Sequence, residues 1–168
     1  MKQVKYIAVL VFVFVFALPS CTTQKNSAAI AALKSAIENR DFTFHAQQVL
    51  PRDYRISQIF PTANAQMFNL SPGYVVKVMN DSLVVDLPFF GRAFQAPMDP
   101  TKGSIKLTTT NFTIKQSKGR KGNIDVTIYP QNSNEIQQMY LTISESGYAT
   151  LSVISYQREQ IGFYGIAQ

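Results

Sequence analysis

Few residues of this chain are of a type that could carry out chemistry. The sequence has 168 residues but one histidine, His45, and one cysteine, Cys21. A hydrolytic triad would have to use His45, yet no Gly-x-Ser-x-Gly nucleophile elbow occurs anywhere in the chain. One histidine and one cysteine are also too few for a zinc or copper site, and no glycine-rich phosphate loop is present. The sequence therefore predicts no catalytic residue, no metal and no cofactor. His45 is expected to be a hydrogen-bonded or half-exposed strand residue.

The carboxylates leave one enzymatic alternative open. Asp86 lies inside an apolar stretch, and Asp125 and Glu145 lie in a predicted strand and a predicted turn. The two carboxylates of a glycosidase meet only in space, so spacing along the chain does not exclude such a pair. An enzyme acting on cell-wall or glycan substrates is therefore kept as a second alternative function.

A basic cluster marks the predicted tip of one hairpin. Contact with anionic lipid or lipopolysaccharide is one interpretation, but a solvated turn that resists aggregation is favoured. A net charge of +6 is too small for the dense basic stripe of a nucleic-acid-binding protein, so no nucleic-acid partner is expected. The cluster consists of Lys115, Lys118, Arg120 and Lys121, with Gly119 and Gly122.

The N-terminus is typical of an exported lipoprotein. Lys2 and Lys5 precede an apolar run of twelve residues, 7–18, which is too short to span a bilayer. The next residues, Leu18-Pro19-Ser20-Cys21, resemble the bacterial lipobox, in which the cysteine sulfur receives a lipid with palmitate-type acyl chains. We therefore expect residues 1–20 to be a cleaved signal peptide and Cys21 to be the lipid attachment site. The alternative is an ordinary signal peptide, or an uncleaved anchor, followed by a chance cysteine.

Residues 21–25 are then a short lipid-anchored tether, and residues 26–168 form a single β-rich domain. The lipid on Cys21 makes the membrane a partner of the protein. The tether carries no acidic run of the kind that resembles a surface-export signal. We therefore expect the protein to lie in the cell envelope, on the periplasm-facing side of the outer membrane.

Hydrophobic periodicity predicts one helix and then many strands. Ile30, Leu33 and Ile37 form an apolar stripe at helical spacing over 28–38. From Phe42 onward the period is two. The predicted fold class is mainly β (α+β), with one short N-terminal helix followed by a curved antiparallel β-meander or an open barrel. The candidate strands are 42–46, 74–79, 83–87, 105–107, 112–114, 124–129, 139–143, 149–153 and 161–166.

The densest aromatic segment, 87–97, is the candidate binding or structural loop. It contains Phe89, Phe90, Gly91, Arg92 and Phe94 between two prolines. The favoured interpretation is that phenylalanines shield Arg92, which pairs with a carboxylate and locks the loop to the sheet. Asp86 and Glu159 are its candidate partners, and Arg158 is a second candidate for the same role. Alternatively, Arg92 faces a cleft and recognises an anionic group.

These motifs carry a resemblance to a known family. The segment Leu87-Pro88-Phe89-Phe90-Gly91-Arg92-Ala93-Phe94, together with Arg158-Glu159-Gln160-Ile161 and Tyr164-Gly165, resembles the lipoprotein family called domain of unknown function 4251. The resemblance implies a fold and the cellular location of a lipoprotein, but it implies no activity. We therefore expect a non-enzymatic envelope lipoprotein that acts as a binding or structural module. Its partner would be an envelope protein, a glycan or a small ligand, and a β cup for a small apolar ligand is the first alternative.

Overall fold

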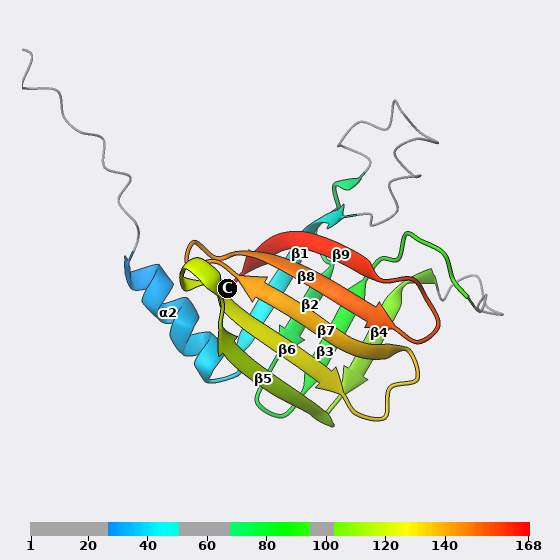
Figure 1. Ribbon diagram of the computed structural model, residues 1–168, viewed down its shortest axis with the longest axis horizontal. Coiled ribbons are helices and arrows are strands. Elements are labelled where there is room, and N and C mark those ends of the chain that lie inside the picture. Colours follow the sequence, from blue (N-terminus) through cyan, green and yellow to red (C-terminus); the bar gives the residue numbers. More distant parts are fainter. Residues whose placement is uncertain (1–26, 51–67, 95–102) are drawn as a thin grey trace, which may run out of the picture.

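The computed structural model describes residues 27–50, 68–94 and 103–168. They form one helix and nine antiparallel strands in a single sheet, which curls into a nearly closed barrel (Figure 1). The predicted fold class is thereby confirmed. The elements are α2 (Ser27–Glu38), β1 (Phe42–Leu50), β2 (Val75–Val78), β3 (Leu83–Leu87), β4 (Ile105–Thr109), β5 (Phe112–Lys118), the 3-10 helix η3 (Arg120–Gly122), β6 (Ile124–Pro130), β7 (Ile136–Ile143), β8 (Tyr148–Ser155) and β9 (Ile161–Ala167).

The strand order shows how the sheet curls. The order is β4-β3-β2-β1-β9-β8-β7-β6-β5, and every neighbouring pair is antiparallel. Strands β4 and β5 follow each other in the chain but form the two edges of the sheet. A two-residue connection joins these edges, so the sheet must bend round on itself. The strand that closes the chain, β9, lies between β1 and β8 and ties the two halves together.

The interior of the barrel is filled by side chains. Alternate residues of most strands are buried, as expected for strands with one inward face, whereas the edge strands β4 and β5 each bury one residue, Ile105 and Ile114. Phe44 of β1 and Phe163 of β9 are fully buried and meet Leu151 of β8 in one apolar core. Such packing gives a solid core, because large aromatic and branched side chains occupy the space that a ligand would need.

Helix α2 packs across one end of the barrel, as its predicted apolar stripe requires. Ile37 is 1% exposed, and Leu33 packs against the core from the same face of the helix. Gln116 of β5 donates a hydrogen bond from Nε2 to the carbonyl oxygen of Ile37 at 2.6 Å. The same carbonyl also accepts a hydrogen bond from the backbone N–H of Arg40 at 3.0 Å, so Gln116 adds a tie between β5 and the C-terminus of the helix. No helix among the described residues has the length and apolarity needed to cross a membrane.

Strand β1 is longer than its alternation predicts, because it continues past Ala46 to Leu50. An irregularity between Ala46 and Gln48 shifts the register against β9 and interrupts the period of two. Gly165 lies opposite Ala46 at this point. A Cβ atom at Gly165 would overlap the carbonyl group of His45, so this close approach of two backbones requires glycine.

Candidate functional site

The phenylalanine-rich segment follows β3 at the end of the barrel opposite α2. Phe89 is partly buried, whereas Phe90 is 53% and Phe94 is 71% exposed. Arg92 is also exposed. The predicted shielding of Arg92 by three phenylalanines is therefore wrong. Residues 95–97, which complete the segment, lie outside the described residues.

The buried arginine is Arg158, which was the second candidate. It lies in the β8–β9 connection and is 7% exposed. Its Nη1 donates a hydrogen bond to the carbonyl oxygen of Gly103 at 2.7 Å, and its Nη2 lies 3.0 Å from Glu135 Oε1. Its guanidinium carbon lies 5.0 Å from the centre of the Phe89 ring, a cation–π contact. The predicted chemistry, an arginine held by a phenylalanine and a carboxylate, is present, but on Arg158.

The pairing of the phenylalanine-rich segment with the β8–β9 connection explains why Arg92 is exposed. Ala93 and Arg158 form an antiparallel bridge, in which Phe94 N donates to Gln157 O at 2.8 Å and Glu159 N donates to Arg92 O at 3.0 Å. Residues that face each other across such a bridge lie on one side of it, and their neighbours lie on the other. The Arg158 side chain is buried on one side of the bridge, so the side chains of Arg92 and Phe94 lie on the opposite, exposed side.

The carboxylates that sequence reasoning offered to Arg92 lie elsewhere. Asp86 Oδ2 is 3.5 Å from Lys106 Nζ on the outer face of β3 and β4, and these side chains are 41% and 67% exposed. Glu159 contributes its backbone N–H, as described above. The carboxylate that pairs with the buried arginine is Glu135, in the turn between β6 and β7. Its Oε1 atom is buried, although the side chain as a whole is 29% exposed, and its contact with Arg158 is an ion pair without hydrogen-bond alignment.

The single histidine has a structural environment. His45 is partly buried in β1, and its Nε2 lies 3.0 Å from Nε2 of Gln168. This contact agrees with the prediction of a hydrogen-bonded, half-exposed strand histidine. Within the described ranges, no three His, Cys, Asp or Glu side chains come together in a group that could hold a metal ion. Cys21 lies outside the described residues.

The basic cluster forms an exposed turn. Residues 120–122 are the 3-10 helix η3, and Lys121 has a φ of 57°. Lys118, Arg120 and Lys121 are exposed, and Lys115 Nζ lies 5.4 Å from the centre of the Tyr129 ring. The exposure of these side chains fits the favoured interpretation of a solvated turn.

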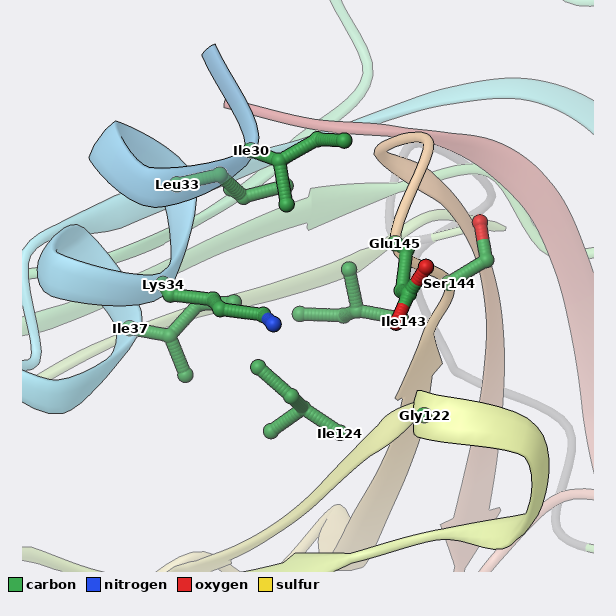
Figure 2. A pocket seen from close by; sticks show the side chains of 9 residues that line it. All are labelled: Ile30, Leu33, Lys34, Ile37, Gly122, Ile124, Ile143, Ser144 and Glu145. Atoms are coloured by element: carbon green, nitrogen blue, oxygen red, sulfur yellow. The ribbon is translucent and has the colours of Figure 1, made fainter. Parts of the chain in front are cut away.

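A small pocket lies where α2 meets the barrel. Figure 2 shows Leu33 and Ile37 of the helix directed toward Ile124 and Ile143, with Glu145 at the rim. Its volume is about 10 Å³, which is close to the minimum needed for one water molecule. This pocket is far too small for a lipid or another apolar ligand. Together with the filled core, it gives no support to the predicted β cup.

The fold and these motifs can be compared with known proteins. The profile of the family described as "Domain of unknown function (DUF4251)" matches residues 24–167, which is nearly the whole described chain. The chain belongs to the DUF4251 family. The resemblance seen in the sequence is therefore confirmed, and it assigns no activity to the domain.

One solved structure similar to this DUF4251 domain is a crystal structure of a DUF4251 family protein from Bacteroides eggerthii DSM 20697. The TM-score is 0.54 at 18% sequence identity, over 86% of this chain and 91% of that chain. At this identity the likeness shows the fold alone. No curated protein matches the sequence.

Sequence reasoning missed two of the groups that hold Arg158 in this DUF4251 domain. Glu135 lies in a polar turn, 23 residues before Arg158, and the Gly103 carbonyl belongs to the start of the segment that leads into β4. Nothing in their sequence context distinguishes either group from ordinary turn residues. The register of β7, β8 and β9 brings Glu135 near Arg158, and register is a property of the folded sheet.

Proposed function

We propose that this DUF4251 domain is a lipid-anchored, non-enzymatic module of the cell envelope that acts by binding or by a structural role. The observation that carries the proposal is the sequence Leu18-Pro19-Ser20-Cys21 after an apolar run of twelve residues, with the chain's sole cysteine at the position that the lipobox gives to the lipidated residue. A lone exposed thiol has no evident use in an oxidising compartment, whereas a lipidated cysteine explains it.

Two structural features support a module that acts through its surface. The barrel core is packed with buried side chains, and the described pocket is about 10 Å³, so recognition by the outer surface is favoured over a cup. Three described carboxylates are engaged by other groups: Asp86 with Lys106, Glu135 with Arg158, and Asp125 with the hydroxyl of Thr142. This arrangement does not favour a pair of catalytic carboxylates.

The anchor would hold the barrel close to the membrane. Helix α2 begins at Ser27, six positions after Cys21. A fully extended chain of this length spans roughly 20 Å. The α2 end of the barrel would therefore be nearest the lipid. The proposed location is the periplasm-facing surface of the outer membrane, because residues 21–25 carry no acidic run of the kind that resembles a surface-export signal.

Replacement of the proposed acceptor tests the anchor. In cells fed an alkyne-palmitate analogue, Cys21→Ser is expected to abolish labelling and to release the protein from the membrane fraction. The matched control Thr22→Ala leaves the sulfur in place and is expected to keep label and membrane association. Density-gradient separation of inner and outer membranes tests the location. Persistent labelling of Cys21→Ser would contradict the proposal.

A further inference from the structure

Four neighbouring strands of the barrel contain no charged residue. No Asp, Glu, Lys or Arg occurs in β7, β8, β9 or β1, which lie side by side in the sheet. Each of the other five strands carries at least one, for example Lys77 in β2 and Asp125 in β6. The chain as a whole has 26 such residues, so their absence from four contiguous strands of the nine is a pronounced asymmetry.

The outward side of these strands is exposed and rich in tyrosine. Tyr148 is 50% and Tyr140 is 42% exposed. The rings of Tyr148 and Tyr164 lie 5.9 Å apart with an interplanar angle of 14°, so they form one stacked aromatic platform. We call the central part of this surface the tyrosine strip, which consists of Tyr140, Tyr148, Thr150, Ser152, Gly162 and Tyr164.

The register places hydroxyl groups between the rings. Thr150 lies opposite Tyr164, while Ser152 lies between Tyr140 on one side and Gly162 on the other. Gly162 has no side chain, and the Cβ atom of Leu50 would lie only 3.3 Å from a Cβ at this position, so the half-exposed Leu50 borders the strip there. With strands roughly 4.8 Å apart and residues roughly 3.4 Å apart along each strand, Tyr140 and Tyr164 are separated by roughly 12 Å. This distance is longer than one sugar ring and suits a short stretch of a polymer.

We propose that the tyrosine strip binds a neutral glycan chain. The C–H face of a sugar ring stacks on an aromatic ring, and its hydroxyls exchange hydrogen bonds with serine, threonine and tyrosine hydroxyls. An uncharged ligand needs no ionic partner, and uncharged side chains need not be stripped of a tightly held hydration shell. An anionic glycan or lipid would instead require the lysines and arginines that these strands lack.

A protein partner fits the strip less well. The centre of a protein interface is typically built from large apolar or arginine anchors that enter pockets. Between its tyrosines the strip presents the hydroxyls of Thr150 and Ser152, the second of which accepts a hydrogen bond from Gln160 Nε2, and its one large apolar neighbour is Leu50 beside Gly162. This inference names the ligand class of the binding module proposed above and rests on that proposal for its binding role, but it does not depend on the lipid anchor.

Calorimetric titration of the full chain, purified in an uncharged detergent, tests the assignment. The probes are the neutral polysaccharides laminarin, dextran and galactomannan, with the anionic polysaccharide alginate for comparison. We expect at least one neutral polysaccharide to bind, and alginate to bind no more tightly. The double variant Tyr148→Ala/Tyr164→Ala is expected to lose about tenfold or more in affinity, since it removes both rings of the stacked platform.

Two further variants and a control separate binding from folding. Tyr148→Phe keeps the ring and is expected to retain binding, whereas Thr150→Arg places a charge beside Tyr164 and is expected to weaken it. The control Tyr129→Ala removes a tyrosine from the outer face of β6, beside Lys115, and is expected to bind like the wild type. Circular dichroism melts confirm that each protein is folded.

Three outcomes would overturn the inference. One is that no neutral polysaccharide binds, even though Cys21 is still labelled by the palmitate analogue, in which case the anchor proposal stands and the glycan assignment fails. Another is neutral-glycan binding that survives both the double alanine variant and Thr150→Arg. The third is a wild-type dimer that the double alanine variant converts to a monomer, which would make a second copy of the chain the occupant of the strip.

Discussion

Removal of the Arg158 side chain should strongly destabilise the domain. Arg158→Ala deletes the hydrogen bond to Gly103, the ion pair with Glu135 and the contact with the Phe89 ring. Breaking a buried ion pair by removing one partner typically costs about 3–5 kcal/mol. Glu135 is 29% exposed and regains some hydration when its partner is lost, which reduces the loss. We therefore expect the free energy of unfolding to fall by about 3 kcal/mol.

Urea denaturation followed by far-ultraviolet circular dichroism measures this loss. For a domain of this size, with a slope of about 2 kcal/mol per molar urea, the midpoint should fall by roughly 1.5 M. Arg158→Met keeps much of the apolar stem and is expected to lose less than Arg158→Ala. The matched control is Arg92→Ala, whose side chain is exposed and which is expected to change stability by less than about 0.5 kcal/mol. Equal midpoints for Arg158→Ala and the wild type, or a larger loss for Arg92→Ala, would refute this assignment of roles.

Two further predictions concern the frame of the barrel. Gly165→Ala would force a Cβ atom into the carbonyl group of His45 and is expected to lower the free energy of unfolding by about 3 kcal/mol or more, or to prevent folding. The control Gly103→Ala places its Cβ in open space and should change the free energy of unfolding in urea by less than about 1 kcal/mol. Similar urea midpoints for the two variants would contradict the close approach of β1 and β9. Changing Lys118, Arg120 and Lys121 together to Ser should lower stability by less than about 1 kcal/mol, since all three are exposed, and a larger loss in the same melts would mean that the turn is packed or paired.

The sequence predicts the elements of the fold well, because their signals are local. The apolar stripe of Ile30, Leu33 and Ile37 is a property of one helical turn after another, and the structure has α2 at that place. The strands are found where alternation predicts them, since each has one buried and one exposed face. The strand ends are predicted less well: β1 continues across the bulge between Ala46 and Gln48, β5 continues to Lys118, and β7 begins at Ile136, where alternation is interrupted or absent.

The candidate site was predicted in its chemistry and in part in its residues, since Phe89 and Arg158 were both candidates, but the favoured arginine was Arg92. An arginine among phenylalanines in a segment near a sheet suggests a shielded cation, and the structure contains one. Which arginine is shielded depends on the register of the bridge between Ala93 and Arg158. A shift of the phenylalanine-rich segment by one residue would place Arg92 opposite Arg158 and turn both arginines to the inner side. Composition contains no information about this register, so the sequence could not choose between them.

The tyrosine strip could not be predicted from the sequence either, because it depends on which strands lie side by side. Each of its strands lacks charge in the sequence, but β1 lies far from β7, β8 and β9 in the chain, and the sheet order is what makes the four contiguous. Protection of the sheet edges explains why Lys106 lies on β4 and Lys115 on β5, and why central strands need no lysine. It does not explain why central strands present exposed tyrosines.

The stacked pair of Tyr148 and Tyr164 separates a folding role from a binding role. A diagonal cross-strand aromatic contact on an exposed face contributes roughly 0.2–1 kcal/mol to stability. If the rings served the sheet alone, Tyr148→Ala and Tyr164→Ala would lower stability by that small amount and leave every binding measurement unchanged. If the rings serve recognition, the double variant Tyr148→Ala/Tyr164→Ala keeps most of the stability but loses about tenfold or more in affinity for a neutral glycan. Because the core residues behind these strands stay in place, the loss of affinity and the loss of stability can be measured on the same folded protein.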